Sequence, residues 1–145
     1  MRPKLHTITV NSQPTIANFS QELSDISSRA GARTILHFAG HTEEEDGRLF
    51  WFEEGKKATN KVPGENLGNI VKLKFKSPES LEQIECVFLN ACHTLPAGLH
   101  LCHAGISHVV CWLHPVKDSV GRKFAEIFYR ELSSQPDNYV DAFEM

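Results

Sequence analysis

The stretch VFLNACHT, residues 87–94, decides how this chain is interpreted. Its apolar run is typical of a buried strand and ends at Asn90, and two residues later Cys92 stands next to a histidine. The stretch TILHFAG, residues 34–40, has the same character, because it is β-branched at its start, almost free of charge and stopped by a glycine. It is followed by His41. We therefore expect two strands buried on both faces, each leading directly to a chemically useful side chain.

Apolar residues at three- and four-residue steps predict helices around these strands. The first begins after a capping Thr15 and ends near Gly31, and a short one covers residues 97–105. The clearest begins at a capping Asp118 or Ser119. Its apolar stripe consists of Val120, Phe124, Ile127, Phe128 and Leu132.

Weaker patterns predict the remaining elements. They are strands over 5–10, 48–52 and 107–113, a hairpin turn at Gly55, a helix within 62–75 and a polar linker over 76–83. Strands that alternate with helices predict an α/β fold with a mostly parallel central sheet and helices on both faces. Ligands of such sheets bind at the carboxyl ends of the strands.

Composition limits the function. The chain has 145 residues, 41% of them hydrophobic and 23% charged, and a net charge of −3. This size suits one domain over residues 1–145, and the charge favours neither nucleic acid nor an anionic membrane as a partner. No run approaches the about 20 apolar residues of a membrane span, and the first residues lack the features of a signal peptide. We therefore expect a cytoplasmic protein with free cysteines.

His41 and Cys92 follow two strands that we expect to be parallel neighbours, so both side chains should emerge at one edge of the sheet. A neighbouring imidazole can take the proton of a thiol and later give it to a leaving amine. Backbone N–H groups at such strand ends can form an oxyanion hole, and we assign those of Thr42 and Cys92. These residues predict a cysteine nucleophile with a histidine proton shuttle and no cofactor.

Three stretches together resemble the CHAT domains, caspase-like cysteine peptidases often found beside tetratricopeptide repeats. They are ILHFAGHT (35–42), VFLNACHT (87–94) and AGISHVVCWLHPVKDSVGRKFAEIFYREL (104–132). The resemblance covers residues 15 to about 142. It implies a caspase-like fold with His41 as the catalytic histidine and Cys92 as the nucleophile. It also implies a protein or peptide substrate and, as a further partner, a regulatory repeat protein.

The chain departs from the family pattern at several positions. Related peptidases that cut after Arg or Lys carry an acidic residue two positions before the nucleophile, and here this position is Asn90. Thr42 replaces the usual glycine after the histidine, and His114 stands where a tryptophan is common. We assign Asn90, His114 and Asp118 to substrate binding. The chain is also short for the family, as a partial gene product, a minimal enzyme or a decayed copy would be.

Two other functions compete with a cysteine endopeptidase. The first is a catalytically weak or inactive interaction module that kept the fold and binds peptides in the old groove. The second is a zinc-stabilised domain, because several histidines and Cys102 crowd the same half of the chain as Cys92. No paired-cysteine or HExxH zinc motif is present, so we assign no metal ligand. The acidic run from Glu43 to Asp46 is either an attraction for a cationic peptide or a solvated loop.

Overall fold

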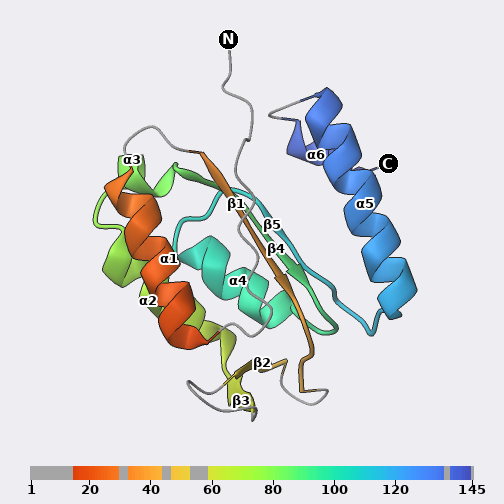
Figure 1. Cartoon of the computed structure of the whole chain (residues 1–145), viewed down its shortest axis with the longest axis horizontal. Coiled ribbons are helices and arrows are strands. Elements are labelled where there is room, and N and C mark those ends of the chain that lie inside the picture. The colour runs from red at the N-terminus through yellow and green to blue at the C-terminus, as the bar shows by residue number, and fades with distance from the viewer. Residues whose placement is uncertain (1–14, 30–32, 44–46, 53–58, 136–137, 145) are drawn as a thin grey trace.

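The computed structural model describes residues 15–29, 33–43, 47–52, 59–135 and 138–144. The predicted strand at residues 5–10, the helix end at Gly31 and the turn at Gly55 lie outside the described residues. Within them the chain forms a mixed α/β fold, in which a parallel sheet lies between two layers of helices (Figure 1). The predicted fold class is therefore confirmed.

The sheet is built from β1 (Thr34–Ala39), β4 (Ile84–Asn90) and β5 (Val109–Val110), in the order β1-β4-β5. Both pairings are parallel. The central β4 is buried along its length except at Asn90, as its unbroken apolar run predicts. The prediction that residues 34–40 are buried on both faces is wrong, because β1 pairs with one described strand and all six of its residues are exposed or partly exposed.

Strand β4 supplies apolar side chains to both faces of the sheet. Ile84, Val87 and Leu89 pack on one side, whereas Cys86 and Phe88 pack on the other. Strict alternation would put Ile84 with Cys86. The register against β1 shifts at Glu85, and this extra residue brings Ile84 to the face of Val87.

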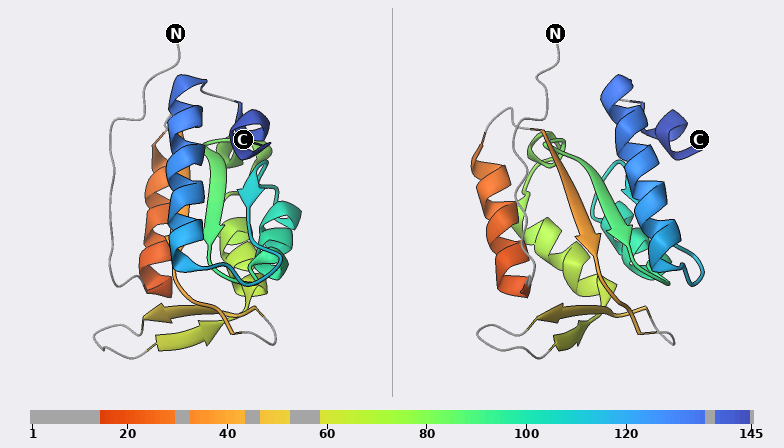
Figure 2. Two further views of the ribbon diagram at one scale, coloured as in Figure 1. Left: turned by 90° about the vertical axis from the view of Figure 1, so that its right-hand side faces the viewer. Right: turned by 45° about the vertical axis from the view of Figure 1, so that its right-hand side comes forward.

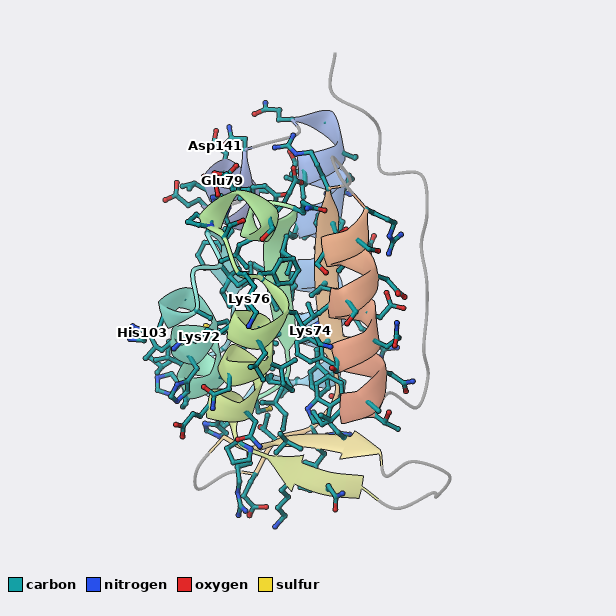
Figure 3. All side chains as sticks on the ribbon, turned by 90° about the vertical axis from the view of Figure 1, so that its left-hand side faces the viewer. Lys72, Lys74, Lys76, Glu79, His103 and Asp141 are labelled. Atoms are coloured by element: carbon teal, nitrogen blue, oxygen red, sulfur yellow. The ribbon has the colours of Figure 1, made fainter. Side chains whose placement is uncertain are left out.

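Three helices cover the first face of the sheet: α1 (Ile16–Ser28), α2 (Gly64–Lys74) and α4 (Leu95–His103) (Figure 2). The predicted cap is confirmed, since Thr15 accepts a hydrogen bond from the N–H of Asn18. Lys72 and Lys74 lie in the last turn of α2, where positive charge favours the helix (Figure 3). The expected polar linker instead contains a short helix, α3 (Pro78–Leu81), because Ser77 caps it.

The second face is covered by α5 (Asp118–Ser134) and α6 (Tyr139–Glu144). Phe128 and Leu132 of the predicted stripe are buried, but Val120 is 51% exposed because it lies in the first turn, beyond the core. The predicted capping side chain is also wrong. Lys117 occupies the cap position without a side-chain hydrogen bond, and Asp118 is already helical.

The predicted strand at 48–52 is confirmed as β2 (Leu49–Phe52), which pairs antiparallel with β3 (Thr59–Val62), a second strand that the sequence analysis did not predict. It lies beyond the carboxyl ends of the parallel strands (Figure 1). Trp51 anchors it to α1 and β1, with its ring centroid 5.6 Å from that of Phe19 and 5.0 Å from that of Phe38. The hairpin therefore flanks the edge at which His41 and Cys92 emerge.

Candidate functional site

His41 and Cys92 follow adjacent parallel strands at the same offset. The register pairs Ala39 with Asn90, so each candidate residue comes two positions after the last pair of the ladder. Parallel strands advance together, and both chains therefore leave the sheet at one edge. This is the edge at which open α/β sheets bind ligands.

A direct bond joins the two loops that follow these strands. The Thr42 hydroxyl donates to the backbone carbonyl of Cys92. Thr42 also forms an antiparallel bridge with Leu49, supported by a 3.0 Å bond from the N–H of Phe50 to the carbonyl of His41. The segment carrying His41 is thus fixed between the hairpin and the loop carrying Cys92.

The sulfur of Cys92 has its hydrogen-bond partners on the chain that leads into α5. The N–H of Val116 lies 3.2 Å from Sγ and can donate to it, and the carbonyl of Val116 lies 3.4 Å away and can accept from the thiol. Cys92 is half-buried and His41 is exposed. Within the described residues the ring of His41 makes no hydrogen bond, so imidazole and thiol are not joined in this arrangement.

The turn after Cys92 is strained and tightly held. His93 has a φ of +53°, a left-handed conformation that is uncommon for residues other than glycine. Gly47, with a φ of +69°, lies against it, because an added Cβ there would stand 2.6 Å from the carbonyl oxygen of His93. This turn keeps Cys92 at the end of β4 rather than in the helix that follows.

Thr94 ties the same turn to the sheet. Its fully buried hydroxyl lies 3.1 Å from the carbonyl oxygens of Leu89 and Ala91 and 2.9 Å from the N–H of Trp112, which donates to it. Sequence reasoning missed Thr94, although a hydroxyl between a buried strand and a predicted helix was a usable signal. It also missed Val116, which acts through backbone atoms and leaves no signal in the sequence.

The oxygen and the nitrogen of the Asn90 side-chain amide both form hydrogen bonds within the protein. Its Oδ1 accepts from Nε1 of Trp112 at 3.1 Å, and its Nδ2 donates to the carbonyl of Gly121 at 3.1 Å. An added Cβ on Gly121 would lie 2.9 Å from Oδ1, so a larger residue at this position would displace the Asn90 amide. In this arrangement Asn90 links β4 to both ends of the segment that contains Val116.

His114 and Asp118, the other residues assigned to substrate binding, are exposed and stand two positions before and after Val116. They therefore lie on the chain that touches Cys92. In the acidic run, Glu43 forms an ion pair with Lys61 at 2.6 Å, whereas residues 44–46 lie outside the described residues. Part of the negative charge beside His41 is thus neutralised by β3.

Among protein families, the model of the CHAT domain matches residues 2–142. The chain belongs to the CHAT family. This is a family of caspase-like, peptidase-related domains, and the resemblance in the sequence is thereby confirmed. No curated protein matches the chain, and no solved structure does.

The edge of this CHAT domain also offers backbone donors beside Cys92. The bridge with Leu49 uses the carbonyl of His41 and the N–H of Glu43, on either side of Thr42, and leaves the N–H of Thr42 itself out of the pairing. Among the described residues, the N–H groups of Thr42 and Cys92 donate to no partner. These are the two N–H groups that the sequence analysis assigned to an oxyanion hole.

The remaining cysteines have environments unlike that of Cys92. Cys86 lies in the core, where burial, followed by the charge of Glu85, raises its pKa to about 12. Burial also raises the pKa of Cys111, with a further contribution from Cys102. A thiol with a raised pKa carries little thiolate near neutral pH, so Cys86 and Cys111 are poor nucleophiles.

Two further classes of site find no support in the described part of the CHAT domain. No group of three His, Cys, Asp or Glu side chains there is arranged to hold a metal ion, so the zinc-stabilised alternative gains nothing from the geometry. No helix in the described segments has the length and apolar character needed to cross a bilayer.

Proposed function

We propose that this CHAT domain is a cysteine endopeptidase that cleaves a protein partner, with Cys92 as nucleophile and His41 as proton shuttle. The observation that carries the proposal is the register of Ala39 with Asn90, which delivers both residues to one edge at equal offsets. The bond from Thr42 to the carbonyl of Cys92 gives independent support, because it joins the two loops directly.

The chemistry follows from the groups at this edge. His41 takes the proton of the Cys92 thiol, and the sulfur attacks the carbonyl carbon of the scissile peptide bond. The N–H groups of Thr42 and Cys92 hold the oxyanion that forms. The C–N bond then breaks, and the leaving amine takes the proton from His41. Water, deprotonated by His41, hydrolyses the thioester and restores the thiol while the acid product leaves.

A neutral residue before the cut fits this site better than Arg or Lys. Asn90 carries no charge and its amide is already bonded at both ends, while Glu43 is paired with Lys61. A cationic side chain would therefore meet little uncompensated negative charge among these residues. The proposed setting is the cytoplasm, where free thiols stay reduced, and a repeat protein is the proposed regulatory partner.

An inactive interaction module is the second candidate, and one observation favours it. The thiol of Cys92 is bonded to Val116 rather than to His41, and the Thr42 hydroxyl occupies the carbonyl of Cys92. Catalytic hydrogen bonds are often formed only when substrate is bound, so this resting arrangement is also compatible with a peptidase. Turnover distinguishes them.

The experiment is a peptide-library cleavage assay with a thiol-directed peptidyl electrophile as a second probe. We expect wild-type protein to cleave and to be labelled, Cys92→Ala to lose both, and His41→Ala to lose cleavage. Matched controls are Cys102→Ala and His103→Ala, which remove an exposed thiol and an exposed imidazole from α4. Cleavage that survives Cys92→Ala contradicts the dyad, and binding of peptides without cleavage selects the interaction module.

A further inference from the structure

Residues 113–117, which we call the strap, connect β5 to α5 and pass over Cys92. Just before the strap, the carbonyl of Trp112 accepts from the N–H of Leu95 at 3.2 Å. At the other end, the carbonyl of Lys117 accepts from the N–H of Gly121 at 2.9 Å. The strap is therefore held firmly where it begins and where it ends.

Between these ends the strap has little other support. Leu113 is 59% exposed, His114 and Pro115 are also exposed, and proline has no N–H to donate. Among the described residues, the hydrogen bonds of residues 113–116 are those that Val116 makes with the sulfur of Cys92. The middle of the strap is thus held by its two contacts with the sulfur of Cys92.

These two contacts fit a thiol that is not reacting. The thiol can donate its hydrogen to the carbonyl of Val116 and can accept from the N–H of the same residue. Its hydrogen is then directed at the strap and not at His41. The strap atoms also lie 3.2 and 3.4 Å from Sγ, the separation at which a reacting carbonyl would approach.

We infer that the strap is an autoinhibitory latch on Cys92 and that Asn90 is the positioning residue that holds it closed. The inference rests on the proposed function, because it describes how the proposed nucleophile is kept at rest. Asn90 bonds to Trp112 just before the strap and to Gly121 in the first turns of α5, so one amide holds the chain on both sides of the strap. Lifting the strap frees Sγ to turn toward His41.

The test measures how fast iodoacetamide alkylates each cysteine, followed by peptide mass spectrometry. Exposed Cys102 is the internal reference and buried Cys86 reports general loosening. We expect Asn90→Ala and Val116→Pro to raise the Cys92/Cys102 rate ratio about tenfold, equivalent to about 1.4 kcal/mol, while Cys86 stays unmodified. Val116→Ala, which keeps the backbone atoms, should leave the ratio unchanged. An unchanged ratio in both opening variants overturns the inference.

A second measurement decides the matter if either variant unfolds. The amide hydrogen of Val116 should exchange more slowly in wild-type protein than in Cys92→Ala, which removes the sulfur acceptor. Equal exchange rates overturn the latch. Neither readout requires peptide turnover, so loss of the latch and loss of peptidase activity are distinguished: the alkylation ratio reports the first, and the cleavage assay reports the second.

Discussion

Thr94 organises the loop that carries Cys92 through one hydroxyl. It is fully buried and bonds to Leu89, Ala91 and Trp112, which belong to the end of β4, the turn and the exit from β5. Removing one partner of a buried hydrogen bond leaves the other partner without a bond, and this lowers the stability by more than the net contribution of the bond. The geometry around the proposed nucleophile therefore depends on a residue that takes no part in the chemistry.

We predict that Thr94→Val destabilises the domain by about 1–3 kcal/mol, because the volume is kept while the N–H of Trp112 loses its acceptor. Denaturant unfolding measures the loss. Thr94→Ser, which retains the hydroxyl, is the matched control and should lie much closer to wild type. Equal stability of the Val and Ser variants would show that the hydroxyl contributes nothing.

His37 gives a pH-dependent prediction. Its Nδ1 lies 2.7 Å from the hydroxyl of Tyr129, its ring stacks on Phe88, and desolvation lowers its pKa below the ordinary value of 6.5. Because the unfolded chain then binds a proton more readily than the folded one, stability falls as pH drops through about 6.5. His37→Gln should remove this part of the pH dependence in denaturant unfolding between pH 5 and 8, roughly the range over which histidine changes its charge. A variant with the wild-type slope contradicts the assignment.

At the scale of elements, α1 depends on signals within its own sequence. The hydroxyl of Thr15 accepts from the N–H of Asn18, and the Asn18 side chain accepts from the N–H of Thr15. We predict that Thr15→Ala lowers the free energy of unfolding by about 1 kcal/mol, since the N–H of Asn18 loses its acceptor. Thr15→Ser should retain most of the stability. The comparison is made by thermal unfolding followed by circular dichroism.

The contact of α2 with α4 depends instead on distant residues. An added Cβ at Gly64 would lie 2.4 Å from Cα of Ala97, so the two helices meet backbone to backbone. We predict that Gly64→Ala costs about 1–3 kcal/mol, because backbone must move to relieve the overlap. Asn66→Ala, at an exposed site in the same helix, is the control and should change stability by less than half of that. If Gly64→Ala left the free energy of unfolding unchanged, the two helices would be able to move apart without cost.

At the scale of the whole molecule, Glu85 joins the C-terminal helix to the sheet. This buried carboxylate lies 2.5 Å from the hydroxyl of Tyr139 in α6 and 2.5 Å from Nε of Arg33 beside β1. The three residues come from three distant parts of the chain. They join α6 to the amino ends of β1 and β4, opposite the candidate site.

We predict that Tyr139→Phe lowers the free energy of unfolding by about 1.5–3 kcal/mol, the usual contribution of a hydrogen bond to a charged group. Because the change lies at the far end of the sheet, alkylation of Cys92 should keep its wild-type rate. Tyr129→Phe removes the bond to His37, which joins two uncharged groups, and should cost less. A larger loss for Tyr129→Phe would reverse the assignment of the stabilising contact.

Much of the fold and part of the candidate site could be predicted without coordinates. The apolar run of β4, the capped start of α1 and the stripe of α5 are local patterns, and each formed the expected type of element. The family resemblance carried by residues 35–42, 87–94 and 104–132 was confirmed. The roles of His41 and Cys92 stay predictions until turnover is measured.

By itself the sequence determined most of the helical and extended segments, although not α3 or β3, because periodicity and capping act over a few neighbouring residues. Only the tertiary structure decided which ends meet. The register of Ala39 with Asn90, the commitment of the Asn90 amide to Trp112 and Gly121, and the Val116 backbone against Cys92 all join residues far apart in the chain. Such contacts follow from packing. Several of them are made by backbone groups, which nearly every residue type carries, so the amino-acid sequence does not show where they form.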